Sequence, residues 1–267
     1  MKKIRFVILS LSLMFSFSVV LGAEYKTIKD IPYRTDAPDD YARSRCVLDV
    51  YYPAGEKGFK TLVWFHGGGL EGGGKYIPEL LKGKGICVVA VNYRLSPKAK
   101  HPAYIEDAAA AIAWTVRNIG KYGGDSTKVY VGGHSAGGYL TLMAGLDDSY
   151  LEPYGIEPAS LAGFYPISGQ TMTHYTIRKE MGLPMEIPYL DKYAPLAHIR
   201  KDTAPIFIIV GQAALEMDCR TAENYYLFEA LKSVGNERVK YHELSGFDHG
   251  SVCDAGLLLV LRDMGVK

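Results

Sequence analysis

Short β-rich runs alternate with helix-length stretches along most of this chain. Leu48, Val50 and Tyr52 alternate with polar neighbours, which predicts an early antiparallel strand with one buried face. Further strands are predicted at Thr61–Phe65, Ile86–Asn92, Val129–Val131, Leu161–Ile167, Pro205–Val210 and Val239–Leu244, and helices at Tyr104–Asn118, Ala136–Leu146 and Thr221–Val234. This order predicts an α/β fold, with a mostly parallel central sheet and helices on both faces.

One segment interrupts the alternation. Gln170–Thr203 contains three prolines and scattered apolar residues without a clear period. A long irregular stretch inside a compact domain is usually functional or forms a small subdomain. It follows a predicted strand at the end where an open sheet holds its ligand, so we predict a cap-like insertion at residues 170–203. The alternative is a surface decoration away from the chemistry. No linker or internal repeat divides the chain, so residues 24–267 are predicted to form a single domain.

Composition and charge narrow the possible partners. The 267 residues are 48% hydrophobic and 22% charged, as in ordinary globular proteins. A formal net charge of +1 gives no field that would recruit nucleic acid or an anionic membrane. A small or neutral substrate is the simpler expectation, and the oligomeric state is left open.

The N-terminus has the pattern of an export signal. Lys2, Lys3 and Arg5 precede an apolar run over residues 6–21, which ends in Gly22 and Ala23. A basic start, a short apolar core and small residues at the end are typical of a secretory signal peptide. We therefore predict a signal peptide at residues 1–23 and a secreted or periplasmic protein without stable membrane insertion. An uncleaved anchor is the alternative.

The four cysteines do not have the spacing of a zinc site, and no metal is predicted. Cys46 and Cys87 lie in apolar sequence and are predicted to be buried free thiols. Cys219 and Cys253 lie in predicted loops. They either form a disulfide, which an oxidising compartment would preserve, or remain unpaired.

The sequence Gly133-His134-Ser135-Ala136-Gly137 lies between a predicted strand and a predicted helix. A nucleophile on such a sharp turn needs glycines on either side, because larger side chains would clash. The turn also places the serine at a helix N-terminus, where negative charge is favoured. The alternative is a structural turn with an unreactive serine.

A second glycine-rich loop, His66-Gly67-Gly68-Gly69, directly follows the predicted strand Thr61–Phe65. Successive glycines leave backbone N–H groups that a substrate oxygen can approach, as an oxyanion intermediate requires. The N–H of Ala136 would add another donor. No lysine–serine ending follows, so a phosphate-binding loop is not indicated. We expect His66 to hold the loop by hydrogen bonds instead of transferring protons.

These motifs together resemble a known group of enzymes. The loop His66–Gly69, the segment Asn92–Pro97, the tripeptide His101–Ala103 and the turn at Ser135 are similar to the hormone-sensitive-lipase-like esterases and to the bacterial acetylxylan and feruloyl esterase-like branch of the α/β hydrolases. The resemblance covers nearly the whole chain after the signal sequence. It implies an α/β-hydrolase fold and an oxyanion hole formed by Gly68, Gly69 and Ala136.

The resemblance also implies a base and an acid. His249 follows the last predicted strand, where the family has its base, so it is favoured over the other histidines of the chain, which include His134, His174, His198 and His242. The position of the usual aspartate is occupied by Ala214. Glu216 comes two residues later and, with a longer side chain, is predicted to be the acid, with Asp218 as the alternative. Asp248 is expected to point away.

The sequence therefore predicts hydrolysis of a carboxylic ester through an acyl-enzyme on Ser135, with no metal or organic cofactor. By resemblance, the substrate is a small-molecule or glycan ester with a short acyl group, acetyl or feruloyl. Alternatives are a formamidase or amidase, a peptidase of the prolyl-oligopeptidase type, and a catalytically impaired hydrolase that serves as a binding protein. Only the last is suggested by a residue, Ala214.

Overall fold

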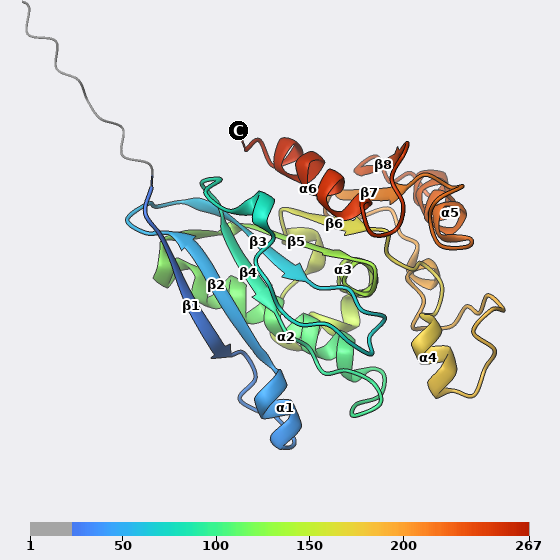
Figure 1. Cartoon of the computed structure of the whole chain (residues 1–267), viewed down its shortest axis with the longest axis horizontal. Coiled ribbons are helices and arrows are strands. Elements are labelled where there is room, and N and C mark those ends of the chain that lie inside the picture. Colours follow the sequence, from blue (N-terminus) through green and yellow to red (C-terminus); the bar gives the residue numbers. More distant parts are fainter. Residues whose placement is uncertain (1–22, 267) are drawn as a thin grey trace, which may run out of the picture.

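The computed structural model describes residues 23–266 and contains one eight-stranded sheet (Figure 1). The predicted signal peptide, except for Ala23, lies outside the described residues. The strands are β1 (Tyr25–Pro32), β2 (Val47–Pro53), β3 (Phe59–Phe65), β4 (Cys87–Val91), β5 (Gly124–His134), β6 (Gly163–Ile167), β7 (Ile206–Gly211) and β8 (Val239–Leu244). Their order in the sheet is β1-β2-β4-β3-β5-β6-β7-β8.

The sheet is antiparallel at one end and parallel elsewhere. β2 pairs antiparallel with both β1 and β4, whereas the pairs from β4 through β3 to β8 are parallel. The central strand β4 is buried at every position, as expected for a parallel strand covered on both faces. The edge strand β1 was not predicted, because its largely exposed sequence, with Lys26, Lys29 and Asp30, shows little apolar pattern.

Helices cover both faces of the sheet, which confirms the predicted fold class. The α-helices are α1 (Asp40–Arg45), α2 (Ala103–Asn118), α3 (Ala136–Leu146), α4 (Tyr175–Glu180), α5 (Arg220–Ser233) and α6 (Val252–Asp263). Short 3-10 helices lie at Glu79–Leu81, Ile119–Tyr122, Asp148–Tyr150, Glu152–Tyr154, Pro158–Ser160 and Pro195–His198. α2, α3 and α5 share one apolar core with the sheet, and α6 packs on the opposite face (Figure 1).

Alternate side chains along a strand divide the core into these two layers. Val63 and Phe65 of β3 face the layer of α2 and α3, while Leu62 and Trp64 face the layer of α6. α3 lies so deep that all of its residues are buried. Between residues 23 and 266, no helix is long and apolar enough to cross a bilayer.

The segment 170–203 contains the short helix α4 and one 3-10 helix, and the rest is irregular. In Figure 1, α4 and its loops project from the side of the molecule near α5. The segment is tied to the loop after β3. The hydroxyl of Thr176 donates a hydrogen bond to the Gly69 carbonyl, and Lys179 forms an ion pair with Glu71 at 2.7 Å. It therefore lies against the glycine-rich loop that the sequence analysis selected.

Candidate active site

Ser135 stands on a sharp turn between the end of β5 and the start of α3. Its backbone has φ 56° and ψ −116°, a strained combination for a residue with a side chain. Glycines make the turn possible. A Cβ on Gly133 would come within 2.5 Å of the Gly137 carbonyl, and one on Gly137 would overlap the Phe65 carbonyl. The turn thus has the geometry of a nucleophile elbow.

Three residues distant in sequence meet at this turn. His249 comes from the loop between β8 and α6, and Glu216 comes from the loop after β7. The Ser135 Oγ lies 2.9 Å from His249 Nε2, and His249 Nδ1 lies 2.5 Å from Glu216 Oε1. With Nδ1–H donating to the carboxylate, Nε2 is free to accept the serine proton.

The Glu216 carboxylate is enclosed by hydrogen-bond donors. Its side chain is fully buried, and it accepts hydrogen bonds from the Ser168 hydroxyl at 2.6 Å and from the Met217 N–H at 2.9 Å, besides that from His249. Burial alone would raise the pKa of Glu216. The hydrogen bonds from His249, Ser168 and Met217 outweigh that effect and lower the pKa to about 2. The carboxylate is therefore ionised at neutral pH.

This carboxylate should make the stability of the fold depend on pH in a defined way. Its pKa falls from an ordinary value of 4.5 to about 2 on folding. Its ionisation therefore stabilises the folded chain above about pH 5, by up to about 3 kcal/mol, and this stabilisation is lost as the pH falls towards 2. We expect Glu216→Gln to lower the free energy of unfolding at pH 6 but hardly at pH 2.5. Urea unfolding of both proteins at each pH measures this difference. An equal gap at the two pH values would contradict it.

The other candidate acids lie elsewhere. Asp218 is exposed and forms no hydrogen bond with His249, and Ala214 is exposed as well. Asp248 accepts hydrogen bonds from the N–H groups of Gly250 and Ser251 and so closes its own turn, pointing away from the imidazole.

The glycine-rich loop supplies free donors beside the serine. Gly68 and Gly69 have positive φ angles of 112° and 64°, which turn the chain sharply after β3. Within residues 23–266, the N–H groups of Gly68, Gly69 and Ala136 donate to no other protein group. A Cβ on Gly67 would lie 3.4 Å from the Ser135 Cβ, so this loop runs directly alongside the nucleophile. Such donors suit a developing oxyanion.

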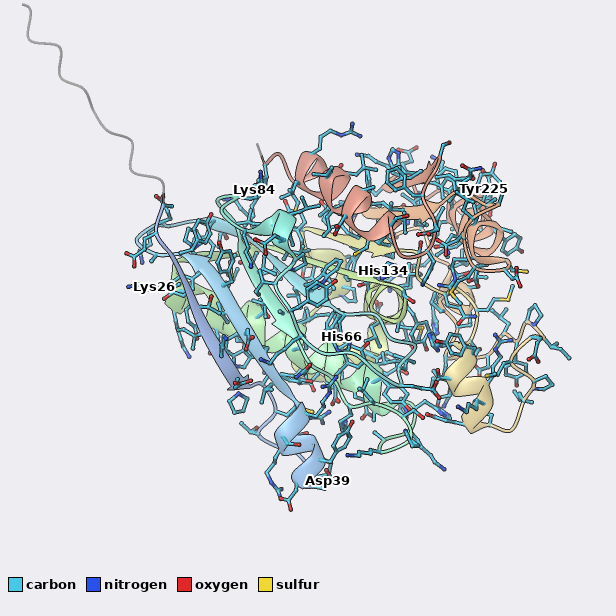
Figure 2. The ribbon with its side chains drawn as sticks, viewed as in Figure 1. Lys26, Asp39, His66, Lys84, His134 and Tyr225 are labelled. Atoms are coloured by element: carbon cyan, nitrogen blue, oxygen red, sulfur yellow. The ribbon has the colours of Figure 1, made fainter. Side chains whose placement is uncertain are left out.

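His66 holds this loop in place. Its ring stacks on Tyr93 at 4.4 Å, Nδ1 lies 2.6 Å from the Gly67 carbonyl, and its own carbonyl accepts a hydrogen bond from the Tyr93 hydroxyl. Burial lowers the pKa of His66 to about 4. His66 is only 2% exposed, and Figure 2 labels it and His134 near the middle of the view. His66 is thus a neutral structural group in the loop.

His134 has a positioning role that the sequence analysis missed. Its Nε2 donates to the His249 carbonyl at 2.6 Å, and the two rings lie 4.9 Å apart. Burial, and then repulsion by the charge that His249 can carry, lower the pKa of His134 to about 4. The neutral ring therefore fixes the backbone of the residue that faces Ser135. A histidine before a nucleophile does not by itself reveal such a long-range contact.

The proposed disulfide is absent. Cys219 and Cys253 are both free thiols, the first exposed at the start of α5 and the second half-buried on α6. Cys46 and Cys87 are buried free thiols, as predicted. The disulfide hypothesis was wrong because lying near the same site in sequence does not bring two Cβ atoms to bonding distance. Within residues 23–266, no cluster of three potential metal-binding side chains occurs.

The strand order and the strained serine turn define the class of fold: this chain has the α/β-hydrolase fold. Residues 48–154 match the BD-FAE family model. Among curated proteins of Mycobacterium tuberculosis, Esterase LipQ is 31% identical over 61% of this chain and 42% of its own length. Esterase LipC is 26% identical over 87% of this chain and 59% of its own length. The chain thus spans about half the length of these relatives.

Solved structures agree on the fold. A truncated form of a carbohydrate esterase from gut microbiota superposes with a TM-score of 0.73 at 19% identity, covering 91% of this chain and 96% of the other. A bifunctional GH43-CE protein of Bacteroides eggerthii gives 0.71 at 23% identity, covering 90% of this chain and 35% of the other. At these identities the likeness establishes the architecture, and the chemistry must be argued from the site.

Proposed function

We propose that this protein is a serine hydrolase of carboxylic esters, with Ser135 as nucleophile, His249 as base and Glu216 as the acid that orients it. The observation that carries this proposal is the continuous chain from the Ser135 Oγ through His249 to the Glu216 carboxylate, next to three unpaired N–H groups. The esterase names of the relatives in sequence support the same reaction class.

The geometry fits a two-step reaction. The Ser135 Oγ attacks the ester carbonyl carbon while His249 Nε2 takes the hydroxyl proton, and the oxyanion accepts hydrogen bonds from Gly68, Gly69 and Ala136. The intermediate collapses to an acyl-serine as His249 gives the proton to the departing alcohol. Water then attacks the acyl-serine, His249 takes its proton and returns it to Ser135, and the carboxylic acid leaves.

The substrate we favour is a short acyl ester, acetyl or feruloyl, on a glycan. Two structural neighbours are described as a carbohydrate esterase and as a GH43-CE protein, and an N-terminus of the secretory type suits an extracellular or periplasmic glycan. The segment 170–203 would cap the site, because its Thr176 bonds to the oxyanion loop at Gly69. The impaired-hydrolase alternative rested on Ala214, which occupies the position of the usual acid. It loses this support because the Glu216 carboxylate lies 2.5 Å from His249 Nδ1 and can take the role of the acid.

Turnover of p-nitrophenyl acetate, butyrate and octanoate by the protein tests the proposal. We expect kcat/KM for acetate to exceed that for octanoate by about tenfold or more, and a fluorophosphonate probe to label Ser135. Hydrolysis of formyl anilides in preference to esters would favour an amidase. No turnover together with no labelling would contradict a serine hydrolase.

A further inference from the structure

A cavity of about 670 Å³ opens beside Glu216, between the segment 170–203 and the start of α5. Its apolar lining comes mainly from thioether and ring side chains: Met172, Tyr175, Met185, Pro188 and Met217. Tyr175 connects the cavity with the oxyanion loop, because a Cβ on Gly69 would overlap the tyrosine hydroxyl. Glu216, which is hydrogen-bonded to His249, also lines the cavity, so a group bound there lies beside the triad.

Arg178 on α4 lines this cavity and lacks a counter-ion. The residue is only 4% exposed, and no carboxylate of residues 23–266 lies within 4.0 Å of its guanidinium. One nitrogen donates to the Ile187 carbonyl, the buried Nε has no acceptor, and no hydrogen bond uses the second terminal nitrogen. Burial lowers the pKa of Arg178. The negative charges of Glu223 and Glu186, which lie further away, oppose this decrease only in part. A buried charge without a partner is costly.

Most other charged side chains that line the cavity are paired. Glu223 forms an ion pair with Arg220 at 2.8 Å, and both are buried. Glu216 pairs with His249, and Glu71 pairs with Lys179. The remaining acids, Glu186 and Asp218, are exposed, where water screens their charge. The unpaired charge inside the wall is therefore the positive charge of Arg178.

We propose that this cavity binds a carboxylate carried by the ester substrate, and that the Arg178 guanidinium recognises it. The inference rests on the proposed esterase function and narrows it to esters that bear a second, ionised carboxyl group. A guanidinium with free donors matches a carboxylate in shape and charge. The methionine walls would contact the hydrocarbon or ring that links the carboxylate to the ester.

The carboxylate can lie on either side of the ester bond, and paired substrates distinguish the two. The mono-p-nitrophenyl ester of glutaric acid is compared with p-nitrophenyl valerate, which has the same chain length and no charge. On the alcohol side, an acetylated methyl glucuronoside, whose C6 carboxylate is free, is compared with the acetylated methyl glucoside by release of acetate. We expect the wild type to prefer the anionic member of one pair, and that pair identifies the side that faces the cavity.

Variants assign the preference to one residue. Arg178→Met is expected to reduce kcat/KM for the anionic ester by about tenfold or more, while changing that for its neutral partner less than about threefold. Arg178→Gln, which keeps a donor for the Ile187 carbonyl, should behave similarly if Arg178→Met folds poorly. Lys232→Met is the control, because it removes an exposed positive charge of α5 that does not line the cavity, and it should keep the preference.

Binding provides a readout without turnover. Calorimetry with Ser135→Ala protein should show that monomethyl glutarate, which carries one carboxylate, binds more tightly than uncharged methyl valerate, and that Arg178→Met added to this background removes the difference. Normal hydrolysis of neutral esters without any preference for the anionic partners would overturn this inference and leave the esterase proposal standing. Absence of all ester hydrolysis would instead contradict the esterase proposal, and equal binding of monomethyl glutarate and methyl valerate would then overturn the carboxylate site as well.

Discussion

Ser135→Ala should abolish ester hydrolysis, with a fall in kcat of about a million-fold. The alanine removes the atom that forms the acyl-enzyme, and His249 then has no hydroxyl to deprotonate. Substrate binding should persist, because the free N–H groups of Gly68, Gly69 and Ala136 remain. Initial rates with p-nitrophenyl acetate at saturating concentration measure the loss, and fluorophosphonate labelling should disappear with it.

A control separates lost chemistry from lost structure. Ser160→Ala removes an exposed hydroxyl at a 3-10 helix far along the chain from the site and should keep full activity. Both variants should unfold at temperatures close to that of the wild type, and Ser135→Ala should be no less stable. Retention of a hundredth or more of the activity by highly purified Ser135→Ala would show that another group is the nucleophile.

Glu216→Gln should lower kcat by about ten thousand-fold with little change in KM. The amide keeps the shape of the side chain but removes the charge that stabilises the imidazolium, and its NH2 group favours the tautomer in which Nε2 carries the hydrogen. Asp218→Asn is the matched control, because it makes the same change two residues away at an exposed carboxylate, and it should cost less than about threefold.

A double variant checks that the residues act as a unit. When the nucleophile is already absent, loss of the acid should add little, so Ser135→Ala with Glu216→Gln should be about as slow as Ser135→Ala alone. A strong loss in Asp218→Asn with a mild one in Glu216→Gln would assign the acid to Asp218 and imply that the loop after β7 rearranges in solution.

The sequence predicted the fold class and the nucleophile because the local patterns behind them are each compatible with a single structure. Buried parallel strands such as β4 must be continuous apolar runs, and the serine turn needs its glycines wherever it occurs, so fold class and Ser135 could both be read from neighbours in the chain. Glu216 could be anticipated too, because a carboxylate displaced by two residues and longer by one methylene can reach the same imidazole.

Contacts between distant segments were not accessible in this way. The hydrogen bond from His134 to the His249 carbonyl joins positions 115 residues apart, and that from Ser168 to Glu216 joins positions 48 apart. Nothing in either local sequence distinguishes these side chains from ordinary polar ones. Spatial neighbours from distant segments also decide whether two cysteines pair and whether Arg178 has a counter-ion. For this reason the disulfide prediction was wrong and the role of Arg178 was not predicted.

The backbone at Ser135 has a consequence for how this protein can change over generations. The conformation that exposes the hydroxyl is one that glycine adopts without strain, so the most stable residue for this turn is not the reactive one. A lineage that no longer needed the hydroxyl could gain stability by exchanging serine for glycine here. A glycine at this turn in a related sequence would therefore indicate a protein that has lost the nucleophile and gained stability.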